Sequence, residues 1–194
     1  LVGSGSIGQV GLFLDQARYL VVSNLAIRQT GTALSILRGQ NLFFDGLRCT
    51  QMATNGVIVA LSTNVEFRHA LLGGSASYAW YGVTNTSTRL VHTMFTSNRT
   101  GAIYLSGGSL GITNSVFVLN EAGLALFTVA NNGVIRSDYN NYRVNQLANL
   151  ANYNGRLHKY PASWLEATTN DLHSLSHDPG FVAVDDYHPV STVG

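Results

Sequence analysis

Apolar residues recur in this chain at a nearly constant interval of 22 or 23 residues, and this repeat constrains the fold more than any other feature. One column of the repeat holds Val22, Phe44, Phe67, Leu90, Ile112 and Val134. A second column, five residues further along, holds Ile27, Cys49, Leu72, Phe95, Phe117 and Tyr139. A third strand-like segment follows in most repeats, as in GVIVAL and GAIYL. Repeats of this length are typical of solenoids.

Each repeat predicts three short strands, because its apolar residues alternate with a period near two and no helical period persists. Three strands in about 22 residues match one coil of a parallel β-helix, in which equivalent residues stack about 4.8 Å apart. A β-sandwich is the alternative, but its hairpins would place Asn-Gly turns between antiparallel strands. Asn55-Gly56 and Asn132-Gly133 instead lie at equivalent places in the repeat. We therefore expect about six stacked coils.

Composition narrows the classes of function. The chain is 45% hydrophobic and 11% charged, with a formal net charge of +1, which gives no electrostatic case for a nucleic-acid partner. No run approaches the roughly 20 apolar residues of a membrane helix, so we expect no membrane insertion. The single cysteine, Cys49, excludes an internal disulfide and falls in a core column.

The segments VVSNLAI, LVHTMF and LGITNSVFVLN resemble right-handed parallel β-helix domains of the pectin-lyase-like class, secreted bacterial type. The tail segments SDYNNY, SWLEATTNDLHSLSHDPGFV and DDYHP are similar to the ends of such proteins. The resemblance covers residues 15–190. It implies a secreted or cell-surface location, a polysaccharide as candidate partner, and contacts with further domains or coils of the same polypeptide. It leaves activity open, because this scaffold carries enzymes, adhesins and spacers alike.

We expect one domain, residues 1–194, all-β, with an entry segment (1–18), coils (19–139) and a C-terminal cap (140–194). Ser163 and Glu166 fit an S-x-x-E capping box, which predicts one short helix at Trp164–Thr169. The start, LVGSGSIGQV, has no initiating Met, and we expect the chain to be a piece of a longer protein.

Charged residues gather at the predicted outward positions of three successive coils. They are Asp45, Glu66, Arg68 and Arg89. As candidate catalytic groups they offer a carboxylate pair for acid and base work, or guanidinium groups that neutralise a uronate. The simpler interpretation is two cross-coil ion pairs, Asp45–Arg68 and Glu66–Arg89, each worth less than about 1 kcal/mol when exposed.

Two further sets are candidate substrate-binding residues. A turn column holds Asn24, Gly46, His69, His92, Asn114 and Arg136, so that His69 and His92 lie on adjacent coils. We expect no metal there, because zinc needs three or four ligands. On the third strand-like segment Tyr104 points outward, with Tyr81 or Trp80 beside it, and exposed aromatic rings are stacking platforms for sugars.

Three motif sets of active relatives are missing from these residues. The N-T-D, D-D, G-H-G and R-I-K set of polygalacturonase-like hydrolases is absent, as are the Asp cluster of calcium-dependent lyases and the D-P-H-E of epimerases. The sequence therefore favours a non-catalytic carbohydrate-associated or structural module without a cofactor. A polysaccharide lyase or glycosidase is the alternative, and an adhesin or spacer the second alternative.

Overall fold

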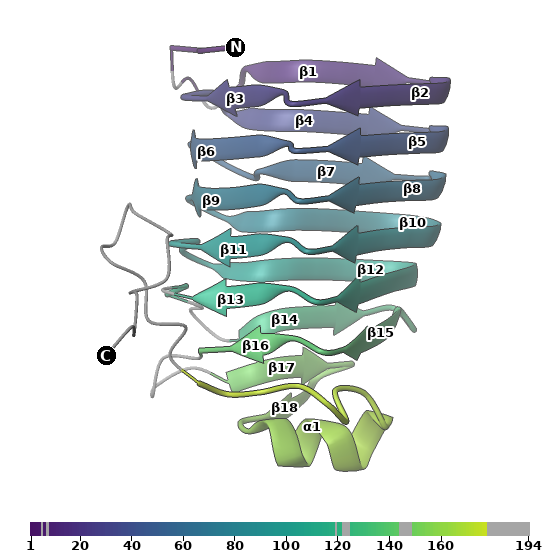
Figure 1. Ribbon diagram of the computed structural model, residues 1–194, viewed down its shortest axis with the longest axis vertical. Helices are drawn as coiled ribbons and strands as arrows, with labels where there is room; N and C mark the ends of the chain where they lie inside the picture. Colours follow the sequence, from purple (N-terminus) through teal and green to yellow (C-terminus); the bar gives the residue numbers. More distant parts are fainter. Residues whose placement is uncertain (5, 7, 119, 122–124, 144–148, 178–194) are drawn as a thin grey trace, which may run out of the picture.

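The chain folds into a right-handed parallel β-helix whose coils stack along the long axis of the molecule, as the computed structural model in Figure 1 shows. The structure describes residues 1–4, 6, 8–118, 120–121, 125–143 and 149–177. Each coil contributes a strand to three faces, which we call the first, second and third faces. Every strand pair within the faces is parallel except β17 with β18, which is antiparallel.

The strands of the three faces alternate along the chain. The first face contains β1 (Val10–Asp15), β4 (Thr32–Leu37), β7 (Val57–Ala60), the first parts of β10 (Tyr78–Val91) and β12 (Gly101–Thr113), β14 (Ala125–Ala130), β17 (Asn149–Tyr153) and β18 (Arg156–His158). The second face contains β2 (Arg18–Ser23), β5 (Gln40–Asp45), β8 (Thr63–Arg68), the last parts of β10 and β12, and β15 (Val134–Asp138). The third face contains β3 (Ala26–Arg28), β6 (Arg48–Met52), β9 (Leu71–Ser75), β11 (Met94–Thr96), β13 (Val116–Val118) and β16 (Asn141–Tyr142).

The strand register confirms the predicted columns except at their last members. Ile112 pairs with Leu90 on one side but with Ser137 on the other, not with Val134. Phe117 likewise pairs with Tyr142 in place of Tyr139. The last step of the repeat is three residues longer than the one before it. The whole final coil is therefore shifted by three residues from its predicted alignment.

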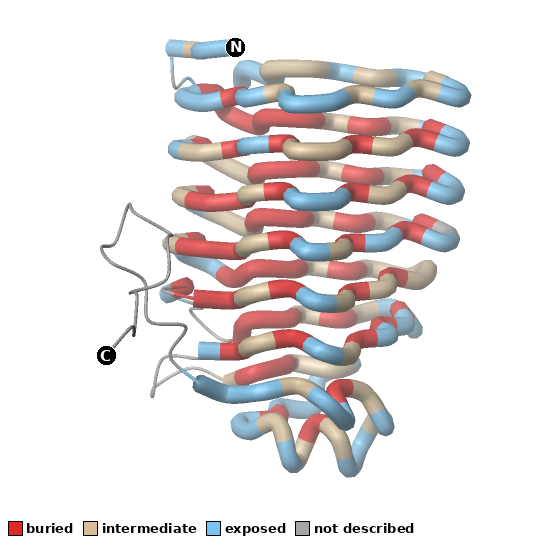
Figure 2. The backbone as a smooth tube through the Cα atoms, viewed as in Figure 1, coloured by how far each residue is buried: buried red, intermediate tan, exposed pale blue. Residues whose placement is uncertain are grey.

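The inward side chains form one continuous core along the axis. The buried residues are red along the backbone tube of Figure 2. Aromatic rings stack between coils: the Phe44 and Phe67 centroids lie 4.9 Å apart, and those of Phe95 and Phe117 lie 4.5 Å apart. A fully buried Phe stabilises the fold by about 1.5–3 kcal/mol relative to an exposed one. These stacked aromatic side chains therefore supply stability that the few ion pairs of this chain do not provide.

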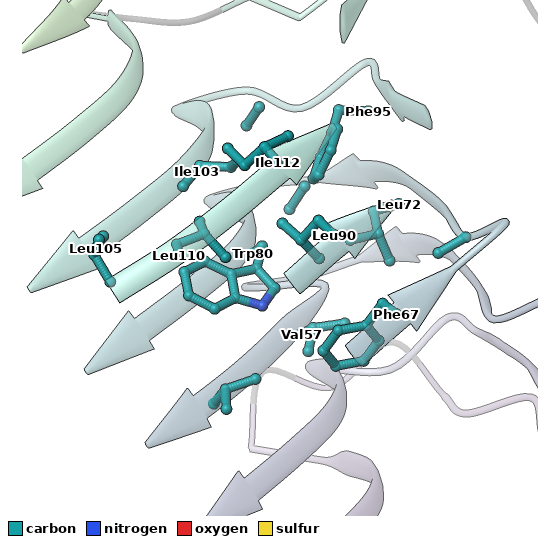
Figure 3. Packing of buried hydrophobic residues seen from close by; sticks show 14 of the residues in the cluster. Val57, Phe67, Leu72, Trp80, Leu90, Phe95, Ile103, Leu105, Leu110 and Ile112 are labelled. Carbon is teal, nitrogen blue, oxygen red and sulfur yellow. The ribbon is translucent and has the colours of Figure 1, made fainter. Parts of the chain in front are cut away.

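Trp80 is one of two fully buried tryptophans in this core, and its indole ring lies between the strands as Figure 3 shows. Val57 and Ile103 are its in-register neighbours, so the indole occupies a place that aliphatic side chains fill in adjacent coils. The ring lies over Gly82, where a Cβ would overlap it. Its Nε1–H has no hydrogen-bond partner among the described residues.

A single left-handed residue makes the corner between the second and third faces in each coil. We call this set the corner column: Asn24, Gly46, His69, His92, Asn114 and Tyr139, with φ between 48° and 69°. Five of these six residues match the predicted turn column. Arg136 was predicted as the sixth member but lies on β15, because of the three-residue shift described above. Asn, His and Gly tolerate this conformation better than other residues.

The C-terminal end of the solenoid is covered by β18 and α1 (Pro161–Thr168). Pro161 stands in the first turn and Tyr160 is the N-cap without a side-chain hydrogen bond. The predicted capping box was wrong, because Ser163 lies inside the helix and its hydroxyl donates to the carbonyl of Tyr160. Proline can start a helix one turn earlier since its missing N–H needs no partner there.

Asp171 fastens this cap to the last coil. Its buried carboxylate accepts hydrogen bonds from Ser137, Asn140, Tyr142, Trp164 and Ser174, at 2.5 to 3.2 Å. Burial and the neighbouring Asp171 raise the pKa of the Tyr142 hydroxyl well above its ordinary value.

The first coil begins earlier than the sequence indicated. β1 starts at Val10 and pairs with β4, within the residues 1–18 that were predicted as an entry segment. Residues 1–3 run beside β3, where Val2 bridges to Arg28. Val182 and the rest of the tail beyond residue 177 lie outside the described residues.

Candidate functional site

The four predicted catalytic groups lie on neighbouring strands of the second face, where Glu66 pairs with both arginines and Asp45 pairs with a histidine outside the set. The Glu66 carboxylate accepts a hydrogen bond from Arg68 Nε, and its other oxygen lies 3.7 Å from Arg89 Nη1. Asp45 Oδ1 lies 2.8 Å from His69 Nδ1, so its partner is a histidine and not the predicted Arg68. The Arg68 guanidinium lies over the Phe43 ring at 5.5 Å from its centroid.

This arrangement favours ion pairs over a general acid and base. Each carboxylate is held by a basic side chain, and neither Asp45 nor Glu66 lines any of the surface hollows described below. Of the four groups, Arg89 alone borders such a hollow. The predicted Glu66–Arg89 pair is present, and exposed pairs of this kind contribute at most about 1 kcal/mol.

The two predicted histidines do lie on adjacent coils. The His69 and His92 rings stack with centroids 5.3 Å apart and an interplanar angle of 14°. At the far end of the corner column, Tyr139 stacks on His173 of the tail at 4.8 Å. No group of three His, Cys, Asp or Glu side chains in the described part of the chain is placed to hold a metal ion.

The predicted tyrosines also come together on the outer side of the first face. The register places Tyr81 beside Tyr104, while Trp80 points inward. The two rings stack at 4.6 Å and 9°, and Tyr78 tilts against both. Burial, with the neighbouring Tyr104 and Tyr78, raises the pKa of Tyr81. Because the rings cover each other's faces, the cluster offers a sugar less stacking surface than the sequence suggested.

A hollow of about 630 Å³ opens on the second face over β12, at a place that the sequence did not predict. Arg89, Gly111 and Arg136 are in register on β10, β12 and β15, so that glycine separates the two arginines. Hydroxyl groups and apolar side chains complete the lining: Ser87, Ser109, Thr113, Val91, Leu110 and Val134. The Arg136 side chain makes no ion pair or hydrogen bond with the described residues. We call this site the arginine hollow.

The arginine hollow was missed because Arg136 was assigned to the turn column. With the correct register, the outward column reads Val21, Phe43, Glu66, Arg89, Gly111, Arg136. A glycine inside a strand weakens the strand and often marks a place where a ligand approaches. The signal was therefore present in the sequence, but at a spacing of 25 residues in place of 22.

A second hollow of about 470 Å³ adjoins the first at the corner, and we call it the corner hollow. Its lining includes His92, Asn114, Tyr139 and His173. The two linings meet along the chain, since Val91 and Thr113 border the arginine hollow and the next residues border the corner hollow.

Cys49 lies in the core as expected and is fully buried. Burial raises the pKa of its thiol to about 12, so it is a poor nucleophile at neutral pH. In the described part of the chain, no helix has the length and apolar character to cross a membrane.

Comparison with known proteins identifies the architecture. The family model described as "Right handed beta helix region" matches residues 4–143. No curated protein matches the chain in a sequence search.

Proposed function

Because the chain belongs to the right-handed β-helix family, we propose that it is a non-catalytic carbohydrate-binding module that holds an acidic polysaccharide in the arginine hollow. Within this proposal the module is of the pectin-lyase-like class, and it is part of a secreted or surface protein of a bacterium. The polysaccharide would lie outside the cell, where such a module meets it.

The observation that carries the proposal is the pair of arginines on either side of Gly111. Parallel strands lie about 4.8 Å apart, so the two backbones flank an open strip roughly 10 Å wide. A guanidinium group matches the planar geometry of a carboxylate, and Arg136 is unpaired among the described residues. The carboxylate or sulfate of an acidic sugar fits this charge, while the hydroxyls of Ser109 and Thr113 suit its ring hydroxyls.

Gly111→Val tests the proposal without disturbing the backbone. A Cβ at Gly111 would make ordinary contacts, with Arg89 Cγ and the Thr88 carbonyl oxygen at 3.8 Å, and its φ is not positive. A β-branched residue also suits a strand. The variant should keep or raise its melting temperature, measured by circular dichroism. Its Kd for polygalacturonate or dextran sulfate should rise about tenfold or more, because the valine side chain fills the strip between the arginines and the sugar loses its charged hydrogen bonds.

Two further variants test whether the loss of binding is specific to the arginine hollow. Arg136→Gln should weaken the same binding, whereas Arg28→Gln, an exposed arginine on β3, should leave it unchanged. Affinity electrophoresis with acidic and neutral polysaccharides measures all four proteins in one format. If Gly111→Val binds as well as the wild type, or if no acidic polysaccharide slows the migration of the wild type, the module is a spacer or binds elsewhere.

A further inference from the structure

The later coils of the corner column carry two stacked pairs of aromatic rings, with a gap between the pairs. His69 and His92 form one stacked pair, and Tyr139 and His173 form the other. Asn114 stands between the two pairs. The Asn114 side chain is exposed, and its amide group makes no hydrogen bond with the described residues.

The width of this gap follows from the strand spacing. His92 and Tyr139 are two coils apart, so their backbones are separated by about 9–10 Å, twice the distance between parallel strands. Rings that project from the corner in the same direction keep about this separation. Rings in van der Waals or CH–π contact lie about 4.5–5 Å apart at their centres, close to the spacings within the two pairs. The gap therefore has room for one more ring.

The polar groups around the gap favour a neutral ring. No carboxylate of the described residues lines the hollow, and Asp138, next to Tyr139 in the chain, is engaged by the backbone N–H and Nδ1 of His173, both at 2.8 Å. The Asn114 amide offers one acceptor and two donors, the groups that recognise sugar hydroxyls. The Asn140 side chain points inward, donating to the carbonyl of Ile112, and adds no free polar group.

We propose that the corner hollow binds one neutral six-membered sugar ring between His92 and Tyr139, with Asn114 hydrogen-bonding its hydroxyls. The inference rests on the proposed function, because it places this ring in the same glycan as the acidic sugar of the arginine hollow. Val91 and Thr113 directly precede His92 and Asn114, so the two hollows are neighbours along both strands and one glycan chain could occupy both.

The repeat itself supplies variants that leave the backbone intact. Asn114 has φ 51°, while His69 and His92 adopt 48° and 50° at the same place in their coils. Asn114→His therefore fills the gap with a side chain that this corner already accepts. Asn114→Gly removes the amide and keeps the gap, since Gly46 stands in the same column.

The experiment is an NMR titration of the full chain with neutral hexasaccharides of glucose, galactose or mannose, followed through the imidazole signals. His92 signals should shift with at least one of these sugars in the wild type, and the buried His158 should not respond. Asn114→His should abolish the shift. Asn114→Gly should raise the Kd about three- to tenfold, the loss expected for a hydrogen bond.

The outcomes separate the two proposals. If acidic polysaccharides bind but no neutral sugar moves the His92 signals, the corner proposal is wrong and the arginine hollow stands. If neutral sugars move the His92 signals while acidic polysaccharides do not bind, the corner proposal stands and the first one fails. Equal shifts in the wild type and in Asn114→His would place the sugar elsewhere and overturn the inference.

Discussion

Gly82 and Trp80 lie on the same strand, and the indole of Trp80 occupies the space that a side chain at position 82 would fill. The inward column through Gly82 otherwise holds Ile36, Val59 and Leu105, and the glycine is what gives the indole room. Gly82→Ala should lower the free energy of unfolding by about 1–3 kcal/mol, because it overpacks the core. Urea unfolding followed by fluorescence measures the change.

A second substitution identifies the cause of that loss. Trp80→Leu reproduces the aliphatic residue of neighbouring coils and frees the space above position 82. The double variant Trp80→Leu/Gly82→Ala should therefore be less destabilised than the sum of the two single changes predicts. Additive losses would mean that the glycine is required by its backbone and not by the indole.

At the scale of elements, the tail is held to the last coil by Asp138 as well as by Asp171. Burial acts to raise the pKa of Asp138, but hydrogen bonds from the His173 side chain and from the backbone N–H groups of His173 and Tyr139 outweigh it. The pKa of Asp138 therefore lies below its ordinary value. A carboxyl group with a lowered pKa stabilises the fold above its unfolded pKa of about 3.9 and loses that contribution as the pH falls through the folded pKa.

The prediction is that His173→Ala raises the pKa of Asp138 toward its ordinary value. Carboxyl NMR signals measured between pH 2 and 6 give the value directly. The tail of this variant should also exchange its amide hydrogens faster at neutral pH, because the His173 side-chain contacts with Asp138 and with the Tyr139 ring are gone. An unchanged Asp138 pKa would show that the backbone N–H groups alone lower it.

The elements also show what the sequence can and cannot predict. Stacked columns such as Phe95 above Phe117 follow directly from the repeat, because every coil must bury the same positions. The extra residues before Ser137 change the last step from 22 to 25 residues. A prediction that assumes a constant step misses them, because the strands themselves keep their apolar pattern. Val134, Arg136 and Tyr139 were therefore misplaced together, and the arginine hollow was missed with them.

Ion-pair partners were also only partly predictable. Glu66 and Arg89 are opposite each other on neighbouring strands and do meet. Asp45 is opposite Arg68 in the same way, yet it pairs with His69, one residue further along, because the left-handed corner turns that imidazole back toward the strand. Strand register fixes which backbones are neighbours, but the rotamers of long side chains decide which charges touch.

The whole molecule has two unlike ends. One end is covered by α1 and β18, whereas at the other the outer edges of β1 and β2 are unpaired among the described residues. Phe13 and Val21 on these strands are 56% and 67% exposed. Unpaired apolar edges promote association between chains. We expect the chain to self-associate at high concentration, and Val21→Lys to reduce this, as measured by light scattering.

Tyr139→Lys provides the matched control for that prediction. Tyr139 is similarly exposed, at 57%, but lies near the covered end of the solenoid. The control should associate like the wild type. Equal association of the Val21→Lys and wild-type chains would place the contact elsewhere on the surface.

The corner column separates the shape of this protein from its surface chemistry. Asn, Gly, His and Tyr all occupy one backbone conformation there, and each projects outward at a fixed interval along the axis. Selection can exchange these residues one coil at a time with little consequence for folding. A new binding specificity therefore needs only single substitutions in the corner column and no change of the backbone.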